Sequence, residues 1–81
     1  MLISFPNDGR KLKKLIIGLL KSGLTSEIKR LNYIESYTLQ EGKIEKKPEK
    51  IISFSTEHSE KVEQFLQKNF SEAKILSDTT Q

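Results

Sequence analysis

The 81-residue sequence contains no cysteine and no tryptophan, and only one histidine and two prolines. The lack of cysteine excludes disulfides, thiolate metal ligands and a thiol nucleophile. A closed structural zinc site needs about four Cys or His ligands, so a single histidine cannot supply one. A domain of this length buries only roughly 60% of its unfolded surface. Partner chains are therefore the most obvious source of additional stability.

Long hydrophobic runs are also missing. The longest, LIIGLL at residues 15–20, is far short of the ~20 residues of a membrane span. The opening MLISFPNDGRKLKK has too short an apolar run before Pro6 for a signal peptide. From these features we predict a soluble, cytoplasmic protein with no membrane partner.

The charge is mildly basic and well mixed. Fourteen Lys and Arg stand against eleven Asp and Glu, which gives a net charge of +3. Opposite charges are interspersed, as in KIEKKPEK at residues 43–50. This pattern is typical of a solvated surface and does not favour nucleic acid as a partner.

The spacing of the apolar residues predicts the secondary structure of the first part of the chain. Residues 2–5, closed by Pro6, are typical of a buried strand. A helix follows, which Asn7 or Asp8 can cap and which ends near Gly23. Its apolar stripe consists of Leu12, Leu15, Ile16, Leu19 and Leu20.

The rest of the chain predicts a long hairpin, a second helix and a last strand. Alternation over residues 26–40 indicates a strand, and Gly42 suits the positive φ of a turn with a hairpin bulge. Pro48 cannot donate a ladder hydrogen bond, so residues 46–49 should form an edge, a bulge or a break. A helix capped by Thr56 and a short strand in AKILS, residues 73–77, complete the pattern.

The predicted order β-α-β-β-α-β indicates an α+β, ferredoxin-like sandwich with a long central β-hairpin. We expect a single domain over residues 1–76 and a flexible C-terminal tail over residues 77–81. Two helices cover only one face of the sheet. The strands nevertheless carry apolar residues at adjacent positions, such as Ile51 and Ile52, which point to opposite faces. Because soluble monomers rarely expose large apolar patches, we expect a closed homo-oligomer.

The segment YTLQEGKIEKKPEKIISFST, residues 37–56, resembles the CutA family of divalent-cation tolerance proteins, as does the opening ISFPNDGRKLKKLI. The resemblance implies a ferredoxin-like homotrimer in which long hairpins pair across subunits. It also implies a role in metal-ion tolerance or homeostasis, with copper or another divalent cation as the ligand. Since the chain has no cysteine, any such ion would lack a thiolate ligand. The residues alone predict no cofactor.

Candidate site residues lie on the long hairpin. We place inter-subunit clefts near Tyr33, Glu35, Tyr37 and Lys43, where Glu35 either pairs with Lys43 or Arg30 or ends a strand in solvent. His58, beside Glu57 and Glu60, is a weak metal candidate, because one imidazole near carboxylates rarely makes a site. No serine has an identifiable base, so we predict that the protein is not an enzyme.

Two other functions have the same predicted topology. An RNA recognition motif stacks bases on sheet aromatics, but the third strand, KIISFS, lacks that module's aromatic pattern. A PII-like signalling protein is the second alternative. Its ligand-gripping loop would replace the tight Glu41-Gly42 turn predicted here.

Overall fold

The computed structural model describes residues 1–78, apart from the side chain of Asn32. It confirms the α+β class and the predicted element order, and the sheet has four strands. The elements are β1 (Leu2–Pro6), α1 (Gly9–Lys21), β2 (Lys29–Gln40), β3 (Lys43–Ser53), α2 (Ser59–Asn69) and β4 (Lys74–Ser77).

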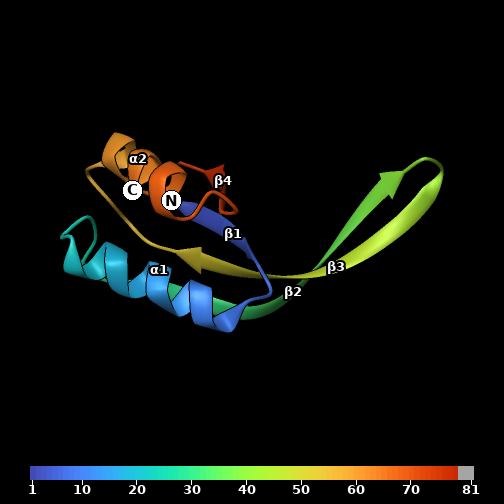
Figure 1. Ribbon diagram of the computed structural model, residues 1–81, viewed down its shortest axis with the longest axis horizontal. Helices are drawn as coiled ribbons and strands as arrows, with labels where there is room; N and C mark the ends of the chain where they lie inside the picture. The colour runs from blue at the N-terminus through green and yellow to red at the C-terminus, as the bar shows by residue number, and fades with distance from the viewer. Residues whose placement is uncertain (79–81) are drawn as a thin grey trace.

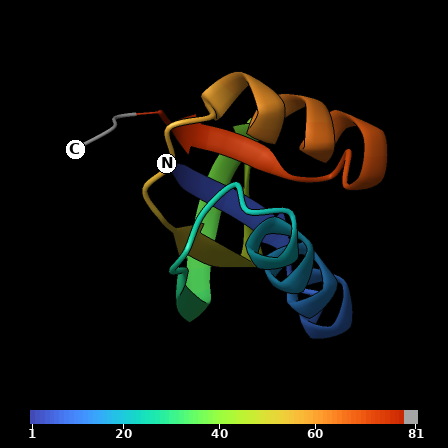
Figure 2. The ribbon, with the colours of Figure 1, turned by 90° about the vertical axis from the view of Figure 1, so that its left-hand side faces the viewer.

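The strands form one antiparallel sheet in the order β2-β3-β1-β4. Ile3 of β1 lies opposite Ile52 of β3 and Ile75 of β4, so these residues share one face. Both helices pack on that face (Figure 2). The resulting core is Met1, Ile3, Phe5, Leu12, Leu15, Leu19, Ile52, Phe54, Val62 and Leu66.

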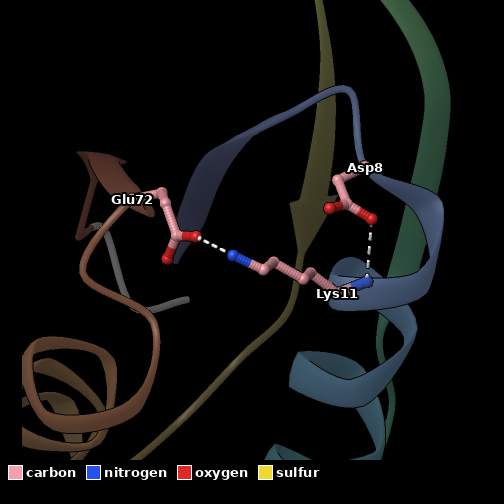
Figure 3. Close-up of polar contacts among 3 residues, drawn as sticks. All are labelled: Asp8, Lys11 and Glu72. Carbon is pink, nitrogen blue, oxygen red and sulfur yellow. Dashed lines mark hydrogen bonds and ion pairs between the residues drawn. The ribbon is translucent and has the colours of Figure 1, made fainter.

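Helix α1 begins and ends as its sequence predicts. The Asp8 side chain accepts a hydrogen bond from the Lys11 backbone N–H at 3.2 Å, so Asp8 is the N-cap (Figure 3). Gly23 has φ of 77°, the left-handed conformation that glycine adopts at low cost. The expected helix is thus fixed at both ends by local chemistry.

The prediction that Thr56 caps α2 is wrong, because the helix begins at Ser59 and His58 is the N-cap residue. The Thr56 hydroxyl instead accepts from the His58 backbone N–H at 3.0 Å and donates to the Leu24 carbonyl at 2.6 Å. Thr56 therefore ties the segment before α2 to the segment after α1.

A salt bridge joins α1 to the loop between α2 and β4. Lys11 Nζ donates to Glu72 Oε2 at 2.8 Å (Figure 3). This contact raises the pKa of Lys11 and lowers that of Glu72. Both side chains remain solvated, so the pair contributes orientation more than stability.

The end of the chain differs in detail from the expected boundary at residue 76. Ser77 belongs to β4 and lies opposite Leu2, and Asp78 accepts a hydrogen bond from the Ser59 hydroxyl at 3.0 Å. The remainder of the expected tail, residues 79–81, lies outside the described residues. Within residues 1–78, no helix has the length and apolar character needed to cross a membrane.

Candidate assembly surface on the hairpin

Strands β2 and β3 form an arm that projects well beyond both helices (Figure 1). The molecule measures 43 × 25 × 23 Å, with the arm along its longest axis. β1 pairs with β3 only from Glu49 to Ser53. Within the described residues, β3 from Lys43 to Pro48 therefore has a strand on one side only, as does all of β2.

The arm has a tight tip and one irregularity. Gln40 pairs with Lys43 across the turn, where Glu41 and Gly42 have φ of 51° and 76°. This is a two-residue turn without the expected hairpin bulge, and it leaves no room for a PII-like gripping loop. The bulge lies instead in β2, between Leu31 and Ile34.

Pro48 behaves as an edge residue, one of the predicted possibilities. It lies opposite Glu35 in β2 and just beyond the last pair between β3 and β1, Glu49 with Pro6. Its missing N–H therefore interrupts no pairing with β1. The strand passes through Pro48 without a break.

Most of the large apolar side chains that are strongly exposed belong to this hairpin. Side chains of this kind usually lie in a core or an interface, and here they are accessible over more than half of their surface. They are Leu31 (58%), Tyr33 (59%), Tyr37 (62%), Leu39 (72%) and Ile44 (75%). Their exposure increases toward the tip of the arm.

The register places most of these side chains on one side of the arm. Leu39 lies opposite Ile44, and Tyr37 lies opposite Lys46. Since alternate residues share a face, Glu35, Tyr37 and Leu39 lie together on β2. We call the surface formed by Tyr33, Glu35, Tyr37, Leu39, Ile44 and Lys46 the arm face.

The polar centre of the arm face is Glu35. Tyr33 donates its hydroxyl proton to Oε1 at 3.3 Å, and Tyr37 donates to Oε2. Lys46 Nζ lies 3.4 Å from Oε2. The Tyr37 hydrogen bond, together with Lys46 and Tyr33, lowers the pKa of Glu35, and the same hydrogen bond raises the pKa of Tyr37. An ionised carboxylate is thus surrounded by donors.

The structure brings together three of the four predicted cleft residues, Tyr33, Glu35 and Tyr37. Lys43 lies at the tip opposite Gln40, about five residues along the strand from Glu35, and makes no ion pair with it. Arg30 is not its partner either, because the Arg30 guanidinium lies beside Gly9. Within one chain, Glu35 is therefore paired with neither Lys43 nor Arg30, and its cation is Lys46.

Lys46 could have been found from the sequence. A two-residue turn at Glu41 and Gly42 fixes the register of the hairpin from its tip to Ile34, and that register puts Lys46 opposite Tyr37 and diagonal to Glu35.

The sheet face away from the helices exposes less apolar surface than the sequence predicts. Ile51 is only 9% exposed and Ser4 only 4%. Leu31, opposite Ile51, and Leu76, next to the inward-facing Ile75, are the strongly exposed apolar residues there. Most of the exposed apolar side chains of the sheet are therefore on the arm and not on the second face.

His58 lies at the start of α2, away from the arm, and is exposed. It lines a shallow groove in which Glu57 is the only carboxylate. Within residues 1–78, no group of three or more His, Cys, Asp or Glu side chains is arranged to hold a metal ion.

Comparisons with known proteins give matches of structure only. No family model matches the sequence, and no curated protein matches it. The structure of the divalent ion tolerance protein CutA1 from Ehrlichia chaffeensis superposes with a TM-score of 0.78 at 18% identity, covering 99% of this chain and 79% of that chain.

CutA from Synechococcus elongatus gives a TM-score of 0.75 at 19% identity, over 93% of this chain and 69% of that one. The periplasmic divalent cation tolerance protein CutA from Archaeoglobus fulgidus gives 0.68 at 18% identity, over 96% and 83%. Identities this low bear on architecture alone. In its architecture, the chain has the ferredoxin-like fold of the CutA proteins.

Proposed function

We propose that this chain is a divergent, non-catalytic CutA-like protein that works as a homotrimer assembled through its hairpin arm. The observation that carries the proposal is the exposure of the arm face, where Tyr37, Leu39 and Ile44 are each more than 60% accessible. An isolated two-stranded hairpin is marginally stable in water. A second copy of the chain would cover these side chains and stabilise the arm.

The unpaired backbone groups of the arm also favour a second copy of the chain as the partner. β2 and the outer half of β3 each leave one row of N–H and C=O groups without a strand among the described residues. Edge strands of this kind accept a strand from another chain. The charged residues of KIEKKPEK oppose indiscriminate edge-to-edge pairing, because a lysine-rich edge resists aggregation. Only a partner with a complementary surface would then pair with this edge.

A closed ring would limit the number of copies in the assembly. Head-to-tail contacts between copies form a ring when the rotation closes, and an open filament when it does not. We propose three copies because the CutA resemblance implies a trimer. The clefts between copies would contain Tyr33, Glu35 and Tyr37, with Lys43 contributed from an arm tip.

The link to divalent cations rests on the names of the structural neighbours. The donor set of a single chain does not fit a metal centre: Glu35 is the only carboxylate of the arm face, and its oxygens already accept from Tyr33, Tyr37 and Lys46. We therefore propose a role in metal-ion tolerance or homeostasis in the cytoplasm through the assembled surface. No step of that role is assigned to a bound ion.

Native mass spectrometry of the tag-free protein tests the assembly. We expect a trimer at micromolar concentration that dissociates on dilution without unfolding. A monomer with native circular dichroism at the same concentration would overturn the proposal. Isothermal calorimetry with Cu²⁺ and Zn²⁺ tests the ligand: weak or no heat is expected, whereas tight stoichiometric binding would contradict the conclusion about the donor set.

A further inference from the structure

The excess positive charge of the molecule lies in its first part. Residues 1–30 contain seven Lys or Arg and two Asp or Glu, whereas residues 31–81 contain seven and nine. Helix α1 alone contains five of these cations and no carboxylate. Helix α2, of similar length, contains two of each sign. One of the two helices is therefore strongly basic and the other is neutral.

The basic residues of α1 share its solvent side. With 3.6 residues per turn, the side opposite Leu12, Leu15 and Leu19 is a single arc. All of its residues are exposed, and it contains no acidic or uncharged polar side chain. We call this arc the α1 outer face: Arg10, Lys13, Lys14, Ile17, Leu20 and Lys21.

The charges on the α1 outer face are not compensated within the described part of the chain. The one cation of α1 that forms an ion pair is Lys11, which reaches away from this face to Glu72 (Figure 3). The Arg30 guanidinium adds to the excess, because it lies 3.7 Å from where a Cβ on Gly9 would stand.

This arrangement weakens the isolated helix. Arg10 and Lys14 are one turn apart, and like charges at that spacing destabilise a helix. Cations in the first turn also oppose the positive end of the helix dipole. A surface that concentrates like charge at a cost in helix stability calls for an anionic partner.

The aliphatic residues of the α1 outer face indicate which class of anionic partner it binds. Ile17 and Leu20 are 41% and 40% exposed; Ile17 lies between the cations of the α1 outer face and Leu20 lies at its edge. The aromatic rings, which single-stranded nucleic acid would need for stacking, lie elsewhere: the phenylalanines are buried or half-buried, and both tyrosines are on the arm. Cations interspersed with aliphatic side chains match an anionic bilayer surface, where the charges meet headgroups and the aliphatic groups enter the interface.

We propose that the α1 outer face docks the protein on membranes rich in anionic phospholipids. This proposal departs from the expectation, drawn from the sequence, of no membrane partner. It does not depend on the proposed assembly, because the α1 outer face is a different surface from the arm face. If the trimer forms, it presents this face three times, and multivalency strengthens the binding.

Co-sedimentation with vesicles tests the proposal on the intact protein. Vesicles containing phosphatidylglycerol should bind the protein, and vesicles of phosphatidylcholine alone should not. Each cation near an anionic surface strengthens binding about fivefold, so Lys13→Gln with Lys14→Gln should weaken it roughly 25-fold. The matched control, Lys61→Gln with Lys68→Gln on α2, removes the same net charge and should leave binding unchanged.

A second pair of variants separates lipid from other polyanions. Ile17→Ser with Leu20→Ser should reduce the binding that survives high salt, since salt screens charges but not aliphatic burial. Circular dichroism checks that every variant folds. The proposal is overturned if the vesicles do not bind, if both lysine pairs act equally, or if the serine pair has no effect. It also fails if single-stranded DNA binds more tightly than the vesicles do.

Discussion

Tyr37 donates its hydroxyl proton to the carboxylate of Glu35, two residues earlier on the same face of β2. Tyr33 and Lys46 direct further donors to that carboxylate. A charge whose oxygens are already hydrogen-bonded enters an interface at much lower cost than a bare one. This cluster therefore lets an otherwise apolar arm face be covered by another chain without leaving an unpaired ion.

Replacing Tyr37 with Asp should disrupt assembly. The variant places a second carboxylate beside Glu35 and removes a donor, so burial would leave an uncompensated charge. Native mass spectrometry at micromolar concentration should show monomer. Tyr37→Phe is the matched control: it removes only the hydroxyl and should still assemble. A fully trimeric Tyr37→Asp protein would mean that the arm face is not the contact.

Gly18 should resist even a small side chain. A Cβ at this position would stand 2.8 Å from the Phe65 ring, so Gly18→Ala forces a shift where α1 meets α2. Overpacking typically costs about 1–3 kcal/mol, which exceeds the roughly 1 kcal/mol that alanine gains in helix propensity. Urea unfolding at fixed protein concentration should therefore show a net loss of stability.

Gly9→Ala provides the comparison for that measurement. A Cβ at Gly9 would make an ordinary contact at 3.7 Å with Arg30. The change should leave stability equal or raise it by about 0.4–1 kcal/mol, because alanine restricts the unfolded chain. If Gly18→Ala proved as stable as Gly9→Ala, the close packing of Phe65 on α1 would be refuted.

Glu41→Asn should stabilise the hairpin. Glu41 has a positive φ of 51°, which costs a glutamate more than an asparagine, and Asn-Gly is the preferred pair for a two-residue turn of this type. We expect a small gain in the free energy of unfolding, because asparagine adopts the left-handed conformation at lower cost than glutamate. Gly42→Ala, at φ 76°, should act in the opposite direction. Thermal unfolding of the two variants and of the wild type measures whether each change raises or lowers the stability.

The Lys11–Glu72 pair should make stability depend on pH. The pKa of Glu72 is lowered below its ordinary value of 4.5, chiefly by the hydrogen bond from Lys11. A lowered folded-state pKa means that the stabilisation is fully present above the unfolded-state pKa and is lost as the pH falls through the folded-state pKa.

Glu72→Gln measures this effect. The difference in unfolding free energy between wild type and variant should be largest near neutral pH and should shrink at pH values below about 4. The effect should be small, because both side chains are solvated. Lys11→Gln and the double variant complete a cycle that isolates the pair. A difference that stays constant with pH would exclude a role for the ionised Glu72.

Much of the fold followed from local pattern in the sequence. The Asp8 cap, the left-handed Gly23 and the turn at Gly42 are each decided by a few neighbouring residues, and the structure has all three. The apolar stripe of α1 is also present except for Leu20, which was predicted to belong to it and is 40% exposed. Helix starts that depend on more distant contacts were harder to predict. Thr56 suits a cap by type, but its hydroxyl bonds to Leu24, which lies far along the chain.

What only the tertiary structure decided is which side chains share a face. The extra residue of β2 between Leu31 and Ile34 reverses the alternation, so that Leu31 falls on the face of Ile51 while Tyr37 and Leu39 fall on the other. All three residues have odd numbers, so uninterrupted alternation would have placed Leu31 on the same face as Tyr37 and Leu39. A single bulge changes every side chain beyond it, because strand side chains alternate with a period of two.

The sequence therefore determined the elements, their order and the two ends of α1, since each depends on short-range backbone geometry. The tertiary structure determined the face on which Leu31 lies, the burial of Ile51 and the exposure of the arm face. These depend on the bulge in β2 and on how far the helices reach along the sheet, neither of which is encoded in any short segment of the chain.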